Sequence, residues 1–224
     1  MAPTELTLAV CLFPLVGPTD FQGPLEQFGF LTQKTVDRGI FNVKVNTFIK
    51  PTYLGITRDP IEPMSGPRLL PDKTYGDVKE GEQFDIVFVP GGYGTARHES
   101  PQVVLDFVRK QAPGAKYVLS VCAGADILAG ADVLNGKRAT TNKSMFLRTV
   151  EDFKDKNIEW VRKARWVVDG NVWTSSGMAA GSDMAYAFVK HLAGYEVAEF
   201  IRGLVEFSAH EQDDDEFAEF HGLI

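Results

Sequence analysis

The sequence predicts an α/β fold in which a mostly parallel sheet carries helices on both faces. Three observations support this prediction. Short apolar runs that suit buried strands alternate with longer segments of helical periodicity. The strand-like runs end in proline or glycine, as at residues 89–92. A chain of 224 residues also suits one sizeable core, so we expect a single domain over residues 1–224.

Composition and charge exclude several classes of protein. Hydrophobic residues make up 44% of the chain and charged residues 24%, which is typical of a soluble globular protein. The formal net charge of -7 argues against a nucleic-acid or anionic-membrane partner, because phosphate binding needs a basic surface. No apolar segment reaches the roughly 20 residues that span a bilayer, and the N-terminus lacks the basic region of a signal peptide. With only two cysteines and no disulfide framework, we expect a cytoplasmic protein.

The N-terminal segment predicts a strand followed by a helix. Residues 6–13 form an apolar run that ends at a proline, as a buried first strand does. Pro24 suits the first turn of a helix that continues to Leu31, which places Asp20 in the loop beyond the first strand. In parallel α/β sheets ligands bind at such strand ends. Asp20 suits a catalytic role there and equally a helix-capping or turn role.

The next third of the chain predicts two more strands around an irregular excursion. Apolar and polar residues alternate at residues 41–48, which predicts a second strand. The proline-rich stretch at residues 50–81 is typical of a covering loop or a short hairpin. Residues 84–90 predict a central buried strand. Gly91 and Gly92 follow it and do not fit a nucleotide-binding fingerprint. Consecutive glycines let backbone N–H groups approach a developing anion, as in an oxyanion hole, although a tight turn also uses them.

Cys122 carries the strongest functional signal. Residues 117–121 predict a buried strand and residues 125–134 a helix, so the cysteine lies at a sharp strand-to-helix turn. Gly124 relieves the crowding of such a turn, which resembles a nucleophile elbow. The free N–H groups of a helix N-terminus favour the thiolate. A structural core cysteine needs none of this context, so Cys122 is the candidate nucleophile.

The remaining segments continue the alternation of strands and helices. Helices are predicted at residues 102–111, 177–188 and 195–207, and strands at residues 136–141, 158–161 and 165–174, the last with a hairpin turn at Asp169-Gly170. The acidic run at residues 211–216 is typical of a solvated tail or turn. Neither this run nor the four histidines has the spacing of a metal site, so no metal is expected.

Together these motifs resemble the ThiJ/PfpI superfamily of flavodoxin-like proteins. The segments that carry the resemblance are residues 20–26 (Asp-Phe-Gln-Gly-Pro-Leu-Glu), 84–92, 120–124, 135–141 and 174–183. The resemblance spans most of the chain. It implies one ThiJ/PfpI-like (class I glutamine amidotransferase-like) domain, a homodimer and a small-molecule substrate.

Within the superfamily, the Asp-x-x-Gly-Pro segment is similar to the isocyanide (isonitrile) hydratase branch, in which an aspartate faces the nucleophilic cysteine. Asp20 and Cys122 match that pair. Two positions depart from the pattern: Ala123 follows the cysteine where the hydratases typically have threonine, and Asn142 stands where a histidine is common. Cys-Ala-Gly is also similar to the branch of the parkinsonism-associated protein, which uses a glutamate near the position of Glu26. The protease-like branch places a histidine directly after the cysteine, which this chain lacks.

The resemblance implies a hydro-lyase that converts an isocyanide into an N-substituted formamide without a cofactor. Cys122 would attack the isocyanide carbon and Asp20 would handle the protons. Because two adjacent anions repel, the pair would share one proton, with Asp20 donating a hydrogen bond to the thiolate. N–H groups near Gly91, Gly92 and Ala123 would bind the developing charge, and Ser176 is a pocket candidate. The alternatives are a glyoxalase or deglycase that acts on methylglyoxal, and a non-enzymatic cysteine-based sensor of oxidative stress.

Overall fold

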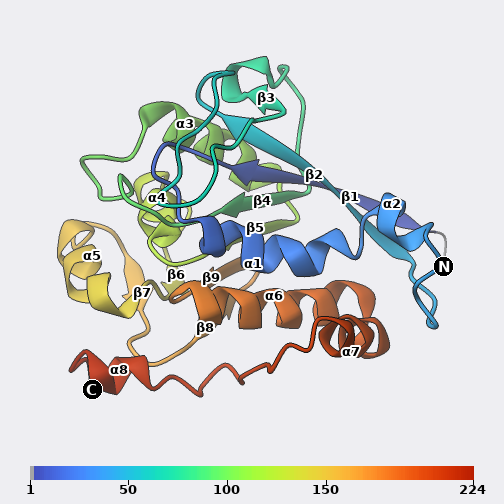
Figure 1. Cartoon of the computed structure of the whole chain (residues 1–224). Coiled ribbons are helices and arrows are strands. Elements are labelled where there is room, and N and C mark those ends of the chain that lie inside the picture. Colours follow the sequence, from blue (N-terminus) through green and yellow to red (C-terminus); the bar gives the residue numbers. More distant parts are fainter. Residues whose placement is uncertain (1–2) are drawn as a thin grey trace.

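The computed structural model describes residues 3–224 and has a seven-stranded sheet at its centre (Figure 1). The strand order is β3-β2-β1-β4-β5-β9-β8, and all neighbours are parallel except the β8–β9 hairpin. The strands are β1 (Thr4–Cys11), β2 (Thr47–Gly55), β3 (Lys73–Thr74), β4 (Ile86–Val89), β5 (Tyr117–Ser120), β8 (Trp166–Asp169) and β9 (Val172–Ser175). A second, two-stranded sheet pairs β6 (Lys137–Ala139) with β7 (Ile158–Trp160). The predicted mostly parallel α/β fold is confirmed.

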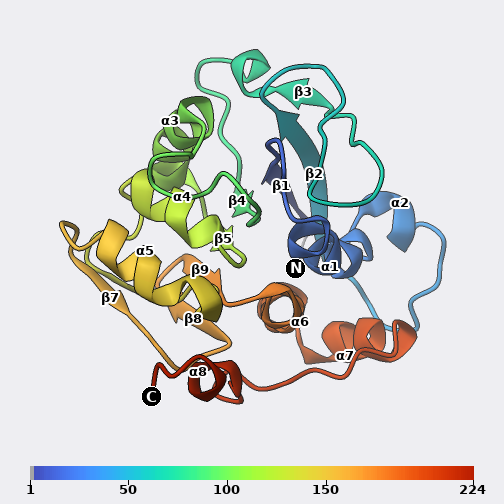
Figure 2. The ribbon, with the colours of Figure 1, turned by 60° about the vertical axis from the view of Figure 1, so that its left-hand side comes forward.

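Helices cover both faces of the main sheet, with α3 and α4 on one face and α1 and α6 on the other (Figure 2). The helices are α1 (Pro18–Gly29), α2 (Gln33–Val36), α3 (Gln102–Gln111), α4 (Gly124–Gly130), α5 (Phe146–Asp152), α6 (Met178–Ala193), α7 (Tyr195–Leu204) and α8 (Phe217–Phe220), with 3-10 turns η1 (Tyr75–Asp77), η2 (Ala112–Gly114) and η3 (Lys143–Met145). Because both faces are covered, every residue of the central strand β4 is buried and apolar. Among residues 3–224 no helix is long and apolar enough to cross a membrane.

Two sequence predictions in the first third of the chain are wrong. The second strand is Thr47–Gly55 rather than residues 41–48, because β2 pairs in parallel along the whole of β1. Pro51 is tolerated inside it, since β3 pairs only with the last two residues of β2 and leaves the rest as an edge strand. Helix α1 begins at Pro18 instead of Pro24, so Asp20 lies in its first turn rather than in the preceding loop.

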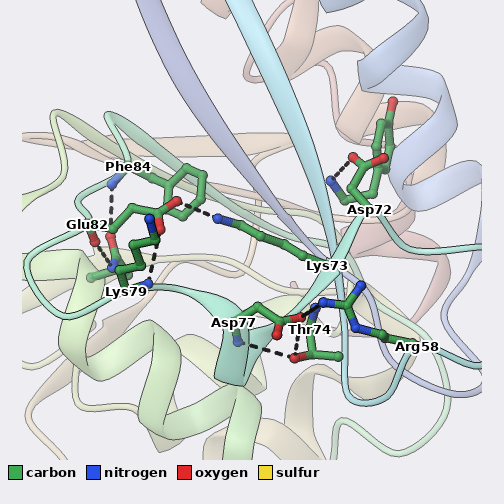
Figure 3. Close-up of polar contacts among 10 residues, drawn as sticks. Arg58, Asp72, Lys73, Thr74, Asp77, Lys79, Glu82 and Phe84 are labelled. Atoms are coloured by element: carbon green, nitrogen blue, oxygen red, sulfur yellow. Dashed lines mark hydrogen bonds and ion pairs between the residues drawn. The ribbon is translucent and has the colours of Figure 1, made fainter.

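The proline-rich segment forms the predicted covering loop, braced by polar contacts. An antiparallel bridge joins Ile61 to Leu69, as in a short hairpin. Figure 3 shows the polar contacts around β3 and η1. Arg58 pairs with Asp77, and Lys73 pairs with Glu82. Thr74 and Asp77 form a reciprocal cap of η1. In the middle of the loop between β2 and β3, the N–H of Met64 donates to the carbonyl of Val16 at 3.0 Å. This bond fixes the loop against the residues that precede α1.

The acidic run at residues 211–216 is mostly exposed and contains a turn, in line with the predicted solvated tail or turn, except that Asp215 is buried. The side chain of Asp215 is buried, lies 3.3 Å from the ammonium of Lys143 and accepts the N–H of Ala164 at 3.0 Å. A buried carboxylate is tolerated when it has both an opposite charge and a hydrogen-bond donor. The run therefore anchors the C-terminal segment beside the strand β8.

Candidate active site

Cys122 stands between β5 and α4 in a left-handed backbone conformation, with φ of 58°. This conformation costs a residue that has a Cβ about 1–2 kcal/mol. Hydrogen bonds hold the turn at both ends. The N–H of Cys122 donates to the carbonyls of Ser175 (3.1 Å) and Ser176 (2.7 Å), and its own carbonyl accepts the hydroxyl of Thr141 (3.1 Å). The predicted strand-to-helix elbow is therefore present and held by β9 and by the segment after β6.

Two glycines allow neighbouring segments to approach the elbow. A Cβ on Gly124 would lie 2.2 Å from the carbonyl oxygen of Val89, and a Cβ on Gly91 would lie 2.6 Å from Oδ2 of Asp20 and 2.8 Å from Cβ of Cys122. No side chain fits at such distances. Glycine at these two positions therefore permits the contact between the cysteine turn and the carboxyl.

The order of the strands brings the three site segments together. Strands β1, β4 and β5 are neighbours in the sheet, so the segments after their carboxyl ends meet at one edge. Two backbone hydrogen bonds tie the loop after β1 to the glycine turn after β4. The N–H of Gly17 donates to the carbonyl of Gly91 at 2.8 Å, and the N–H of Tyr93 donates to that of Leu15 at 3.0 Å. These bonds set the first turn of α1 over the elbow.

Asp20 is 5% exposed, and its carboxyl lies against the elbow, because a Cβ on Gly91 would meet both Oδ2 of Asp20 and Cβ of Cys122 within 2.8 Å. Burial raises the pKa of Asp20 to about 6, although the neighbouring thiol of Cys122 and the N–H of Gly91 act in the opposite direction. Burial, and then the negative charge of Asp20, raise the pKa of Cys122 to about 12. The N–H of Ala123 and the amide of Asn142 oppose that rise.

These directions place the shared proton on the sulfur of Cys122 at neutral pH, with Asp20 as the carboxylate that accepts its hydrogen bond. The sequence-based expectation of a thiolate at Cys122 that accepts a hydrogen bond from Asp20 is therefore wrong for the resting site, although the N–H of Ala123 lowers the pKa of Cys122 in the expected direction. Desolvation and the adjacent carboxylate outweigh the first turn of α4, which is only 7 residues long. The carboxylate of Asp20 is thus a group beside the sulfur that can accept a proton.

A pocket of about 330 Å³ opens over the pair, and Asp20 carries the only charged side chain that lines it. Its walls include three methionines that come from different parts of the chain, Met64, Met145 and Met178. The flexible, apolar methionine side chain suits an uncharged substrate. No group of three or more His, Cys, Asp or Glu side chains within residues 3–224 is arranged to hold a metal ion.

The other predicted site residues have different surroundings. Gly92 and Ala123 line the pocket, whereas the N–H of Gly91 donates to the carboxyl of Asp20. Ser176 lines a neighbouring pocket of about 250 Å³ and contributes only its carbonyl to the elbow. Glu26, the acid that the alternative branch would use, is exposed and lies outside the pocket that holds Cys122.

Sequence reasoning missed Asn142 as a site residue. Its Nδ2 lies 3.2 Å from Sγ of Cys122, and the residue lines the same pocket. The only signal in the sequence was its departure from the histidine that is common at this position. That departure did not indicate that Asn142 contacts Cys122. The two residues are separated by α4 and β6, and their contact depends on how the second sheet packs.

An elbow cysteine that faces a buried carboxyl at the carboxyl edge of a flavodoxin-like sheet defines a class of α/β proteins with a reactive thiol. Comparison with known proteins makes the assignment definite. The chain belongs to the DJ-1/PfpI family, whose model matches residues 39–191.

Individual relatives in this family have different activities. The chain is 31% identical to an isonitrile hydratase of Pseudomonas putida, over 91% of this chain and 79% of the relative. It is 25% identical to a glutathione-independent glyoxalase of Caenorhabditis elegans, over 69% of this chain and 80% of the relative. The crystal structure of a ThiJ/PfpI family protein from Pseudomonas syringae superposes with a TM-score of 0.75 at 26% identity and covers 92% of this chain and 77% of that one.

We predict that alkylating agents modify Cys122 before Cys11 in the folded protein. Cys11 is fully buried in β1, whereas Cys122 is partly exposed at the pocket floor. Reaction of Cys122 should be slow at neutral pH, because its pKa is raised to about 12. Peptide mapping after limited treatment with iodoacetamide checks this order, with Cys122→Ala as the control that should stay unlabelled. Preferential labelling of Cys11 would remove the case for Cys122 as the nucleophile.

Proposed function

We propose that this protein is an isonitrile hydratase, which adds water to an isocyanide to give an N-substituted formamide. The observation that carries the proposal is that the buried carboxyl of Asp20 and the thiol of Cys122 lie side by side in a pocket that no other charged side chain of residues 3–224 lines. An isocyanide carbon must gain both a nucleophile and a proton. A thiol beside a carboxylate with a raised pKa supplies both.

In the first half of the proposed reaction, the S–H bond of Cys122 breaks and its proton moves to the carboxylate of Asp20. The sulfur electron pair forms an S–C bond to the isocyanide carbon, and that carbon takes the proton from Asp20. The product is a thioimidate in which the substrate nitrogen remains bonded to carbon, and Asp20 is again a carboxylate.

In the second half, Asp20 removes a proton from a water molecule that adds to the thioimidate carbon, and it passes this proton to the substrate nitrogen. The C–S bond then breaks as the added hydroxyl becomes the carbonyl of the formamide, and the hydroxyl proton passes through Asp20 to the sulfur, so that Asp20 is again a carboxylate and Cys122 a thiol. Ala123 and Gly92 line the pocket beside the reacting carbon, where backbone N–H groups would stabilise the developing charge. No cofactor takes part in this sequence.

The second candidate is a glyoxalase or deglycase that acts on methylglyoxal. Ala123, in a Cys-Ala-Gly sequence, favours it, as does the likeness to a glyoxalase. The exposure of Glu26 argues against it, because the acid of that branch would then face solvent. A non-enzymatic sensor of oxidative stress needs only the thiol and gives no reason for the buried carboxyl of Asp20.

Homodimer formation and a cytoplasmic location belong to the same proposal. The family resemblance supports the dimer. Both cysteines are free thiols, which suits the reducing environment of the cytoplasm.

We predict that the purified protein hydrates aryl and alkyl isocyanides and that the activity depends on both members of the pair. Cys122→Ala should abolish turnover, and Asp20→Asn should lower kcat by roughly 100-fold or more, the usual scale of general acid–base help. Formamide production followed by chromatography, with methylglyoxal tested in parallel, checks this. Cys122-dependent loss of methylglyoxal without any isocyanide turnover would establish the second candidate instead.

We also predict that kcat/KM for the isocyanide falls as the pH drops below about 6, because Asp20 acts as a base only in its ionised form and its pKa is raised from 3.8 to about 6. An unperturbed aspartate would keep activity down to about pH 4. The residual activity of Asp20→Asn should lack this acidic limb. A wild-type profile that stays flat down to about pH 4 would show that the carboxyl of Asp20 is not the base.

A further inference from the structure

The amide of Asn142 touches the nucleophile, yet the two-residue mechanism gives it no part. Its Nδ2 lies 3.2 Å from Sγ of Cys122, within the range of a hydrogen bond to sulfur. The residue lies just after β6 and caps the 3-10 turn η3. It reaches the sulfur from a different segment than Asp20, which belongs to α1.

Ser144 fixes which end of the amide faces the sulfur. Oδ1 of Asn142 accepts the backbone N–H of Ser144 at 3.0 Å and its hydroxyl at 2.6 Å. A backbone N–H can only donate, so the atom that it contacts must be the amide oxygen. The NH₂ group of Asn142 is thereby directed at Cys122 as a donor.

Both chain neighbours of Asn142 are anchored in the protein. The hydroxyl of Thr141 donates to the carbonyl of Cys122 at 3.1 Å. On the other side, the buried ammonium of Lys143 lies 3.3 Å from the carboxylate of Asp215, and Lys143 does not line the pocket that holds Cys122. The amide donor is therefore held in place before any substrate arrives, which is the condition for stabilising charge without reorganisation.

We propose that Asn142 is a third catalytic residue, whose amide stabilises the negative charge that develops on the sulfur of Cys122 while Asp20 takes the proton. This inference rests on the proposed function and deepens it. The hydrogen bond acts in the expected direction, because it opposes the rise in the pKa of Cys122 that burial and Asp20 cause. An amide neither gains nor loses a proton in this pH range, so it assists the sulfur without acting as a second base.

The other groups around the sulfur leave this role to Asn142. Asp20 faces it from α1, and Tyr93 lines the pocket from the turn after β4. The ammonium of Lys143, which comes from η3, is paired with Asp215. The lining residues of the proline-rich loop and of the start of α6 are uncharged. Apart from the N–H of Ala123, the amide of Asn142 is the donor that lowers the pKa of Cys122.

The test compares Asn142→Leu, which keeps the approximate volume and removes the donor, with Asn135→Leu, the same change in an exposed turn. We expect Asn142→Leu to slow alkylation of Cys122 by iodoacetamide at mildly alkaline pH about 10-fold or more, and to lower kcat/KM for the isocyanide about 10- to 100-fold, the scale of a hydrogen bond to a charged group. Asn135→Leu should match the wild type in both. Circular dichroism checks that each variant folds. If Asn142→Leu does not fold, Asn142→Ala takes its place in both measurements.

Two outcomes separate this inference from the proposed function. If Asn142→Leu is alkylated at the wild-type rate across the pH range, the amide does not stabilise the sulfur anion and the inference is overturned, whatever the substrate. If the wild type hydrates no isocyanide but Asn142→Leu still slows alkylation, the assignment of the substrate fails and the action of Asn142 on the sulfur stands. Wild-type isocyanide turnover by Asn142→Leu would also overturn the inference.

Discussion

The contact between the buried carboxyl of Asp20 and the thiol of Cys122 is the interaction on which the site depends. Two anions in contact inside a poorly solvated pocket repel each other strongly, so the pair keeps one proton between its members. Burial raises the pKa of both groups, to about 6 for the carboxyl and about 12 for the thiol. The proton therefore rests on the sulfur and has an acceptor next to it. The charge state of the thiol thus depends first on its burial and then on the neighbouring carboxylate.

The fold creates this contact at some cost to local stability. Cys122 adopts a left-handed backbone conformation that is unfavourable by about 1–2 kcal/mol, and the hydrogen bonds from β9 and Thr141 offset it. Gly91 is required because any Cβ there would collide with both members of the pair. The sheet order β1-β4-β5 is what makes the three segments neighbours. Each device acts on backbone geometry, and a Cβ at Gly91 or Gly124 would force the contacting segments apart.

The sequence predicted the parts of the site that depend on local patterns. The elbow at Cys122 follows from a short apolar strand, a small-residue turn and a helix, and the same reasoning gave α3 with its observed bounds. It was wrong about β2, because parallel pairing with β1 carries the strand through Pro51 to Gly55. The buried ion pair of Asp215 and the amide of Asn142 escaped prediction for a related reason. Both contacts join segments that are distant in the chain, and their residue types alone suit a solvated surface equally well.

Membership of the DJ-1/PfpI family does not by itself determine the reaction of this chain, because its relatives include an isonitrile hydratase and a glyoxalase. The reaction depends on the side chains of the site. The central claim is that the carboxylate of Asp20 keeps Cys122 protonated until substrate arrives. The most direct test is the pH dependence of Cys122 alkylation in Asp20→Asn compared with the wild type. Removing the negative charge should shift the midpoint of the reaction to lower pH, so that the variant is alkylated faster at neutral pH although it has lost its proton acceptor. An unchanged or higher midpoint in Asp20→Asn would contradict the account.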